Sequence, residues 1–278
     1  MVTSIPRRRF LVMARAGENS LHPHWLKGAD RNFDLYLSYY GNQPGKYAAD
    51  ADHWREMKST KWPALHEHIA SERALIESYE AVWFPDDDLL IDTAGINRMF
   101  DLFVGLGLSL AQPSLSHDSH FSHAAVLQHP DYLYRLNNFV EVMGPIFSRE
   151  ALRLLHPTFE QSKTGWGLDY LWLDLLDRAG HGNRIGILDA VTMTHTRPVG
   201  GGDIYQGKES PGVMDVAHLR SLYPDADLKT RSRRAKFGIF GGAKIVGPRS
   251  TLLARLLGRS FCRWAKSKAR RTPKFRRD

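Results

Sequence analysis

The sequence predicts an α/β protein whose mostly parallel central sheet is flanked by helices. Short apolar runs of strand length alternate with segments of helical periodicity, the pattern of strands joined by crossover helices. The 278 residues, 42% of them hydrophobic, are enough to bury a sizeable core. Some apolar runs end in acidic residues or a histidine, and ligands of parallel sheets bind beyond the carboxyl ends of strands.

The first predicted elements are two strands and a long helix. Residues 8–15 contain the apolar run FLVMA and precede a loop with glycine and proline, so we expect a buried strand. Residues 33–41 form a second apolar run, which ends at a glycine. Residues 62–80 have Pro63 near their start and apolar residues at helical spacing, which predicts a helix.

The middle of the chain predicts three more strands and a short helix. The run AVWF at 81–84 is expected to be a strand with three aspartates at its carboxyl end. Two further runs, at 108–115 and 139–148, are also apolar and of strand length. The segment REALRLL, at 149–155, has the composition of a short helix.

A helix and a strand complete the alternating pattern. Residues 165–180 carry leucine and tryptophan on one face and close at Gly180, which predicts a helix. Residues 184–195 are expected to be the last strand. After about residue 205 glycine, proline, serine and charge dominate, so we expect 206–249 to be a linker or a loosely attached segment.

Three aspartates, Asp86, Asp87 and Asp88, follow the predicted strand at 81–84. A divalent cation would relieve the repulsion among their carboxylates, and Mg²⁺ and Mn²⁺ prefer oxygen ligands. On a turn, Asp86 and Asp88 project to the same side while Asp87 points away, so one can bind a metal and the other a sugar hydroxyl. The alternative is a solvated polar turn in which Asp88 caps the next helix.

Two later segments carry further candidate residues. Asp169 lies in the first turn of a predicted helix, where the helix dipole favours an ionised carboxylate that could act as a general base. The glycines on either side of Trp166, one of which is Gly167, would let the backbone approach a ligand closely. His195 ends the last predicted strand and could bind Mn²⁺ beside carboxylates. Each of these residues could instead be structural.

Taken in this order, the motifs resemble the GT-A class of nucleotide-sugar-dependent glycosyltransferases. The segment GWGLD is similar to the Gly-Trp-Gly-acid segment of metal-dependent galactosyltransferases, although Leu168 and Asp169 stand where those enzymes have an acidic pair. The resemblance is closer still to domain-of-unknown-function family 707, which is grouped with GT-A folds. It spans roughly residues 8–200 and rests on the segments FPDDDLLID, LAQPSL, FVEVMGPIFSREALRLL, TGWGLDYLW and LDAVTMTHTRPVG.

The resemblance implies a GT-A-like catalytic domain over 1–205 and a role for each candidate residue. Asp88 and His195 would bind Mn²⁺ or Mg²⁺, Asp86 would contact the metal or the nucleotide ribose, and Asp169 would be the base. The implied nucleotide or diphosphate contacts are Arg15, Lys58 and Lys61. The implied acceptor-binding residues are Trp166, Gly167 and Glu141.

The implied activity is metal-dependent transfer of a sugar from a nucleoside diphosphate, with UDP-sugars favoured, to an acceptor hydroxyl with inversion. A glycan or a lipid-linked acceptor, as in polysaccharide or glycolipid synthesis, is the expected partner. Two alternatives stay open at this point. One is a metal-dependent phosphoester hydrolase, and the other is a non-catalytic sugar- or nucleic-acid-binding protein that keeps the fold.

The carboxyl-terminal region is strongly basic: 17 of the 38 Lys and Arg residues and only one of the 30 acids fall after residue 228. Residues 250–278 predict an amphipathic helix and tail, with leucine, phenylalanine and tryptophan opposite a basic face. Such a helix suits an anionic membrane surface better than nucleic acid, which we consider an unlikely partner. The alternative is a helix docked on the protein body.

Composition also bears on the compartment. Cys262 is the only cysteine, which excludes an internal disulfide framework and a cysteine-based zinc site. The apolar run near the amino terminus is too short for the core of a signal peptide, and no stretch approaches the length of a spanning helix. We therefore expect a cytoplasmic protein, with peripheral attachment to the inner face of the membrane through the tail.

Overall fold

The computed structural model describes residues 8–137, 139–200, 211–226, 228, 239–244, 247–248, 264–272 and 274. The strands are β1 (Phe10–Ala16), β2 (Phe33–Tyr39), β3 (His53–Glu56), β4 (Ala81–Trp83), β5 (Leu89–Leu90), β6 (Leu110–Leu115), β7 (Tyr132–Asn137), β8 (Ile146–Ser148), β9 (Ile185–His195), β10 (Ile239–Lys244) and β11 (Gly247–Pro248). The helices are α1 (His22–Trp25), α2 (Lys61–Ser71), α3 (Arg73–Ile76), α4 (Thr93–Gly105), α5 (Arg149–Leu155), α6 (Leu168–Arg178) and α7 (Pro211–Leu222). The 3-10 helices are η1 (Ala48–Asp50), η2 (Ala124–Val126) and η3 (His156–Gln161).

The strands of the described residues form one mixed sheet in the order β11-β10-β7-β9-β6-β8-β4-β1-β2-β3, with β5 paired to β9. Strands β3, β2, β1 and β4 run parallel to one another, as do β6 and β9. Strand β8 lies antiparallel between β4 and β6, and β7 and β10 extend the sheet with further antiparallel pairs. The α/β architecture is thus as predicted, but the sheet is mixed rather than mostly parallel.

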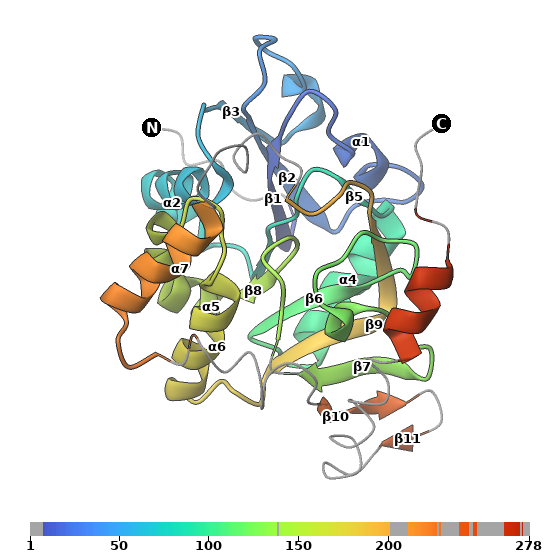
Figure 1. Cartoon of the computed structure of the whole chain (residues 1–278). Helices are drawn as coiled ribbons and strands as arrows, with labels where there is room; N and C mark the ends of the chain where they lie inside the picture. The colour runs from blue at the N-terminus through green and yellow to red at the C-terminus, as the bar shows by residue number, and fades with distance from the viewer. Residues whose placement is uncertain are drawn as a thin grey trace.

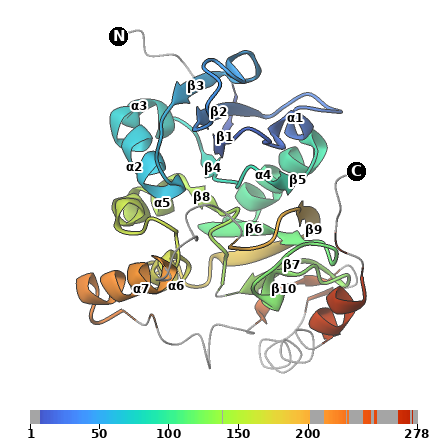
Figure 2. The same cartoon turned by 45° about the horizontal axis from the view of Figure 1, so that its top comes forward.

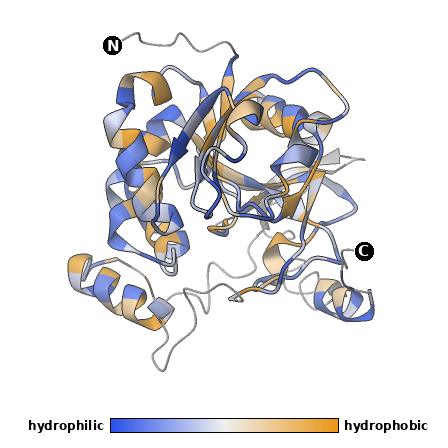
Figure 3. Ribbon diagram, turned by 90° about the horizontal axis from the view of Figure 1, so that it is seen from above, coloured by the Kyte–Doolittle hydropathy of each residue, from blue (hydrophilic) through white to orange (hydrophobic). Residues whose placement is uncertain are grey.

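Helices cover both faces of the sheet. Figures 1 and 2 show α2, α5, α6 and α7 on one side and α1 and α4 on the other. Strand β1 is buried along its whole length, which is why it reads as an unbroken apolar run. In Figure 3 the central strands are largely apolar, whereas the helices that cover them also carry hydrophilic residues.

Each strand predicted from an apolar run contains a strand in the structure, with different bounds. The largest difference falls at 139–148, where only β8 is extended in the sheet. The segment before it, through Gly144 and Pro145, gives its backbone carbonyls to other partners: the carbonyl of Met143 accepts from Asp86 N at 2.6 Å. The long helix predicted at 62–80 is divided into α2 and α3 at Glu72, whose φ and ψ of −118° and 31° are not helical.

Helix α4 follows the aspartates after strand β5 and was not predicted from the sequence. Its amino-terminal cap is Asp92, whose side chain accepts a hydrogen bond from Gly95 N at 2.8 Å. The polar-turn alternative, in which Asp88 caps the next helix, is therefore wrong. Asp88 does not cap this helix.

An aromatic cluster lies beneath the loop that carries the aspartates. The ring of Trp62 in α2 lies 4.9 Å from that of Trp172 in α6, and Trp172 lies 5.1 Å from Phe147 in β8. Phe147 in turn packs 5.5 Å from Phe84, two residues before Asp86. These residues are buried, so the helices, the sheet and the aspartate loop share one core.

A buried ion pair joins two neighbouring strands and a loop. Arg135 in β7 binds Asp189 in β9 with two hydrogen bonds of 2.6 and 2.9 Å, and both side chains are fully buried. The same guanidinium donates to the carbonyls of Ala125 and Leu127, each at 2.8 Å. Arg135 therefore fixes η2, and with it the loop 116–129, to the sheet.

The region beyond residue 205 contributes ordered elements where the structure describes it. Helix α7 packs over the amino-terminal end of α6, and β10 pairs with β7 at the edge of the sheet. Residues 264–271 are helical, and Ala265 and Ala269 are buried in the core cluster. The apolar positions predicted at 250–263 lie outside the described residues. No helix of the described part is long and apolar enough to cross a bilayer.

Candidate active site

Asp88 and His195 lie side by side although they are far apart in the sequence. Strand β5, which begins one residue after Asp88, pairs with the end of β9 in the register Leu89 to His195 and Leu90 to Thr194. The carbonyl of Asp88 also accepts hydrogen bonds from the amide of Thr196 at 3.1 Å and from its hydroxyl at 2.9 Å. As a result, Asp88 Oδ2 lies 3.4 Å from His195 Nε2.

The orientation of His195 suits a ligand of a metal ion. Its Nδ1 lies 2.9 Å from the carbonyl of His120, to which it donates, so Nε2 faces Asp88. Burial lowers the pKa of His195, but the hydrogen bond to Asp88 and its charge outweigh burial and raise that pKa to about 9. His195 therefore carries a proton beside Asp88, and a cation that binds here displaces it.

A divalent cation fits this pair when other oxygen atoms complete its shell. The described residues contain no group of three or more His, Cys, Asp or Glu side chains placed to hold a metal ion. Mg²⁺ and Mn²⁺ nevertheless commonly bind through one or two protein ligands together with phosphate oxygens. Asp88 Oδ1 is buried and accepts no hydrogen bond from the described residues. The pair therefore fits a cation shared with a bound diphosphate.

Asp86 is held by Lys61 rather than by His195. Lys61 Nζ lies 2.6 Å from Asp86 Oδ1 and also donates to the carbonyls of Phe84 at 2.9 Å and Val142 at 3.0 Å. Burial lowers the pKa of Lys61, against the effect of Asp86. Of the three cationic residues predicted to contact a nucleotide, Lys61 is thus the one that the structure brings to the aspartates.

Asp87 connects two loops on the other side of the cluster. Its carboxylate accepts from Gly17 N at 2.7 Å and from Arg197 at 3.2 Å, and its carbonyl accepts from Leu21 N at 2.6 Å. Burial, reinforced by the neighbouring carboxylates, raises the pKa of Asp87 to about 6. Asp87 therefore fixes the loop after β1 to the segment after β9.

Arg15, at the end of β1, is buried and directed toward protein acceptors. Its guanidinium donates to the carbonyls of Met57 at 2.6 Å and Ser59 at 2.8 Å and to the hydroxyl of Ser38. Ser38 Oγ also lies 2.7 Å from His68 Nε2. Burial lowers the pKa of Arg15 to about 10. Arg15 positions the segment 57–59, and its contact with a nucleotide stays a prediction.

We expect protonation of His68 to destabilise the protein as the pH falls. Burial, with a smaller effect of Arg15, lowers the pKa of His68 from 6.5 to about 4. The unfolded chain binds the proton more readily, so this stabilisation is complete above about pH 6.5 and is lost as the pH falls toward 4. Between about pH 7 and 4.5 the wild type should lose about 2 kcal/mol more unfolding free energy than His68→Gln, measured by urea denaturation. Parallel pH profiles would contradict this.

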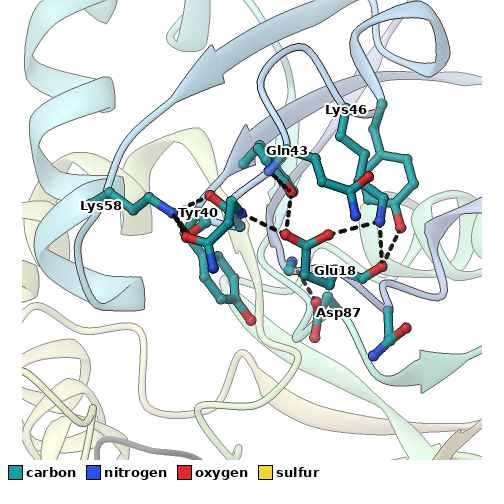
Figure 4. Close-up of polar contacts among 12 residues, drawn as sticks. Glu18, Tyr40, Gln43, Lys46, Lys58 and Asp87 are labelled. Atoms are coloured by element: carbon teal, nitrogen blue, oxygen red, sulfur yellow. Dashed lines mark hydrogen bonds and ion pairs between the residues drawn. The ribbon is translucent and has the colours of Figure 1, made fainter.

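Lys58 fixes the loop after β2, as Figure 4 shows. Its Nζ donates to the carbonyls of Tyr40 at 2.8 Å and of Gly41, and to Asn42 Oδ1 at 2.8 Å. Its predicted contact with a nucleotide or diphosphate would require some of these bonds to change.

The carboxylate of Glu18, in the loop after β1, accepts hydrogen bonds from several neighbouring residues (Figure 4). It accepts from the hydroxyl of Tyr39 at 2.6 Å, from Asn42 N at 2.5 Å and from Lys46 Nζ at 2.8 Å. The bond from Lys46, followed by those from Tyr39 and Asn42, lowers the pKa of Glu18 to about 2. These bonds fix the loops that follow β1 and β2 to each other. The loops lie at the carboxyl ends of two parallel strands, where such sheets bind ligands.

The Gly-Trp-Gly segment precedes α6 and is covered by α7. Trp166 is 39% exposed, and a side chain added at Gly212 of α7 would meet its ring at 2.3 Å. Gly167 has φ of +93°, and a side chain there would meet Leu219 of α7 at 2.9 Å. The glycines therefore allow close packing of protein against protein, where close approach to a ligand was expected. Asp169 lies buried in the first turn of α6.

Replacing Gly165, the first of the two glycines, is expected to be costly. It has φ of +84°, and an added Cβ would lie 2.4 Å from Trp62 Nε1. Gly180 has a similar φ of +81° with nothing within 4 Å, so Gly180→Ala isolates the backbone cost of about 1–2 kcal/mol. Gly165→Ala should cost about 1–3 kcal/mol more, because the indole must move. Equal midpoints in urea denaturation would contradict this.

Glu141 is buried beside a histidine that the sequence did not single out. Its amide donates to Gln112 Oε1 at 2.5 Å, and its Oε1 lies 2.6 Å from His123 Nδ1. The hydroxyl of Tyr170, next to Asp169 in α6, lies 3.3 Å from His123 Nε2. Because 13 histidines are spread along the chain, only the fold identifies His123.

Comparison with known proteins gives structural matches alone. No family model matches the chain, and no curated protein matches its sequence. S. aureus TarS superposes with a TM-score of 0.50 at 12% identity over 80% of this chain and 40% of the TarS chain. This chain therefore spans less than half the length of that protein. Two structures of glucosyl-3-phosphoglycerate synthase from Mycobacterium tuberculosis also match.

The first, solved with Mn²⁺ and UDP-glucose, has a TM-score of 0.46 at 18% identity over 77% of this chain and 79% of its own. The second, solved with phosphoglyceric acid, has a TM-score of 0.46 at 16% identity over 77% of this chain and 80% of its own. At 12% identity the match to TarS bears on the fold alone. The chain has the GT-A-like fold that its sequence motifs predict.

Proposed function

We propose that this protein is a metal-dependent glycosyltransferase that moves a sugar from a nucleoside diphosphate to an acceptor hydroxyl with inversion. The proposal rests on one observation: Asp88 Oδ2 lies 3.4 Å from His195 Nε2. Asp88 follows the carboxyl end of β4, and His195 ends β9. One oxygen of Asp88 is buried without a hydrogen-bond donor among the described residues. A carboxylate and an imidazole placed in this way suit a divalent cation, and the GT-A-like fold is the setting for such a site.

Residues around the aspartate loop are proposed to bind the donor. Asp88 and His195 would hold Mn²⁺ or Mg²⁺, which when bound supplies positive charge to the departing diphosphate. Lys61, which forms an ion pair with Asp86, adds a cation beside the aspartate loop. Asp86 is the proposed contact to the ribose or the metal, and Arg15 and Lys58 are more distant proposed nucleotide contacts.

The acceptor is proposed to bind near the start of α6. Trp166, Gly167 and Glu141 are the proposed acceptor contacts, and Asp169 is the base expected from the sequence. A base there would take the proton of the acceptor hydroxyl while its oxygen attacks the anomeric carbon from the face opposite the diphosphate. The bond from that carbon to the diphosphate oxygen breaks, and its electron pair leaves with the diphosphate. A glycan or a lipid-linked sugar is the proposed acceptor.

Titration calorimetry tests the proposal without knowledge of the acceptor. UDP and then GDP are titrated into the full chain with Mn²⁺, with and without a chelator. Metal-dependent binding of one nucleotide supports the proposed donor site and identifies the nucleotide base. If neither binds, the phosphoester hydrolase and the non-catalytic binding protein become the better hypotheses.

The basic carboxyl-terminal helix is proposed to touch an anionic membrane surface. In residues 264–271, Ala265 and Ala269 pack on the body, whereas Lys266, Lys268 and Arg270 are exposed. Changing these three to glutamine should weaken binding to vesicles that contain phosphatidylglycerol by about 1 kcal/mol per residue. Sedimentation with these vesicles measures the effect, and vesicles of phosphatidylcholine alone are the control. Equal sedimentation of the variant and the wild type would contradict membrane attachment through this helix.

A further inference from the structure

A carboxylate, an imidazole and a phenol form a chain of contacts beside the aspartate loop. Glu141 Oε1 lies 2.6 Å from His123 Nδ1 and also accepts from His123 N at 3.1 Å. His123 Nε2 lies 3.3 Å from the hydroxyl of Tyr170. The ring of Phe139 packs 4.6 Å from the imidazole and 5.6 Å from the ring of Tyr170. Phe139 therefore packs against both His123 and Tyr170.

Glu141 determines which nitrogen of His123 carries the proton. A carboxylate can only accept, so Nδ1 donates to Glu141 Oε1, and Nε2 of the neutral ring is the basic atom. The side chain of Glu141 is 4% exposed, and its second oxygen, Oε2, is buried without a hydrogen-bond donor among the described residues. An unsatisfied buried carboxylate oxygen is costly unless a donor binds to it. A hydroxyl of a bound sugar would supply that donor.

The chain of contacts lies next to the proposed donor site. Glu141 precedes Met143 by two residues, and the carbonyl of Met143 accepts from Asp86 N at 2.6 Å. The loop that carries His123 also contains Ser119, whose hydroxyl accepts from His195 N at 3.1 Å. The loop 116–129 therefore contacts His195 through Ser119 and also carries His123.

We infer that His123 is the group that takes the proton of the acceptor hydroxyl, with Glu141 and Tyr170 positioning it. This inference rests on the proposed glycosyltransferase function. An imidazole is a better proton acceptor near neutral pH than a carboxylate.

In the transfer step the acceptor hydroxyl replaces the Tyr170 hydroxyl as the donor to His123 Nε2. Its proton goes to that nitrogen, and the acceptor oxygen bonds to the anomeric carbon. The bond from that carbon to the diphosphate breaks, and the diphosphate leaves with the electron pair. Glu141 stabilises the resulting imidazolium, which returns its proton to water after the product leaves.

Hydrolysis of the donor tests this step, with water in place of the acceptor. UDP-glucose, UDP-galactose and their N-acetylamino counterparts are incubated with the full chain and Mn²⁺, and UDP release is followed from about pH 5 to 9. His123→Gln should lower kcat about 10²–10⁴-fold, with the Kd of UDP within twofold of the wild type. Glu141→Gln and Tyr170→Phe should give smaller losses, and the exposed His24→Gln should match the wild type.

Other outcomes separate the inference from the proposed function. Metal-dependent UDP binding with a rate in His123→Gln within threefold of the wild type would overturn the role of His123 alone. Loss of rate in Asp169→Asn but not in His123→Gln would return the role to Asp169. If the wild type binds no nucleotide, the proposed function fails, and the inference fails with it.

If UDP binds but no donor is hydrolysed, imidazole nitrogen NMR spectra decide the question. They are recorded with Mg²⁺ before and after addition of UDP-glucose, and His123 is assigned from the His123→Gln spectrum. A shift of its Nε2 resonance supports contact with the donor site, and an unchanged resonance overturns the inference.

Discussion

Asp88→Asn is expected to weaken Mn²⁺-dependent binding of UDP by at least about 100-fold, because one of the two proposed protein ligands loses its charge. The amide cannot neutralise the cation, and His195 loses the carboxylate that lies 3.4 Å from its Nε2. The pKa of His195 should then fall from about 9, since its rise depends on Asp88. Calorimetry of UDP with Mn²⁺, with and without chelator, gives the change in affinity.

The chain offers a matched control four residues away. Asp92 caps α4 through Gly95 N, and asparagine is an equally good cap, so Asp92→Asn should preserve both the fold and the nucleotide affinity. A thermal unfolding midpoint for Asp88→Asn close to that of the wild type would confirm that the variant is folded. Unchanged UDP affinity in Asp88→Asn would remove the metal role from this residue.

Arg135→Met is expected to lower the free energy of unfolding by about 3–5 kcal/mol. The substitution leaves Asp189 charged and buried, and it removes the donors to the carbonyls of Ala125 and Leu127. Urea denaturation followed by tryptophan fluorescence measures the loss. Because Arg135 fixes the loop that carries Ser119 and His123, the variant should also bind UDP more weakly.

A double variant separates the two parts of this cost. In Arg135→Met with Asp189→Leu the unpaired charge is gone, whereas the two carbonyls still lack their donors and the His129 amide lacks its acceptor. The double variant should therefore regain about 1–2 kcal/mol relative to Arg135→Met but stay below the wild type. A loss of less than 1 kcal/mol in Arg135→Met would show that the pair contributes little.

The sequence predicts the buried strands of the sheet best. β1 is an unbroken apolar run, and the second half of β9 alternates between buried and half-buried residues; both are bounded by turn residues. Strand β3 was missed because its sequence, HWRE, is polar and half-exposed at the sheet edge. The antiparallel direction of β8 could not be predicted either, since a run of three residues carries no information on the direction of a strand.

The part of the candidate site that lies at strand ends could be predicted from the sequence. Asp88 and His195 each stand next to a strand terminus, and the structure brings them together; their role as metal ligands stays a prediction. Lys61 was named, but its ion pair with Asp86 depends on how α2 packs against the aspartate loop. His123 lies in a loop without periodicity, so only its contact with Glu141 distinguishes it from the other histidines.

The pairing of β5 with β9 links the proposed chemistry to the order in which the chain folds. Two residue pairs, Leu89 with His195 and Leu90 with Thr194, hold Asp88 beside its partner, together with the hydrogen bonds from Thr196 to the carbonyl of Asp88. Side chains alternate between the faces of a strand, so a slip of one residue would turn His195 away. The two strands are also separated by a long stretch of chain, and contacts of this kind close late in folding. A chain that has not yet formed this short ladder would lack the proposed cation site, and a bound metal diphosphate would stabilise these late contacts.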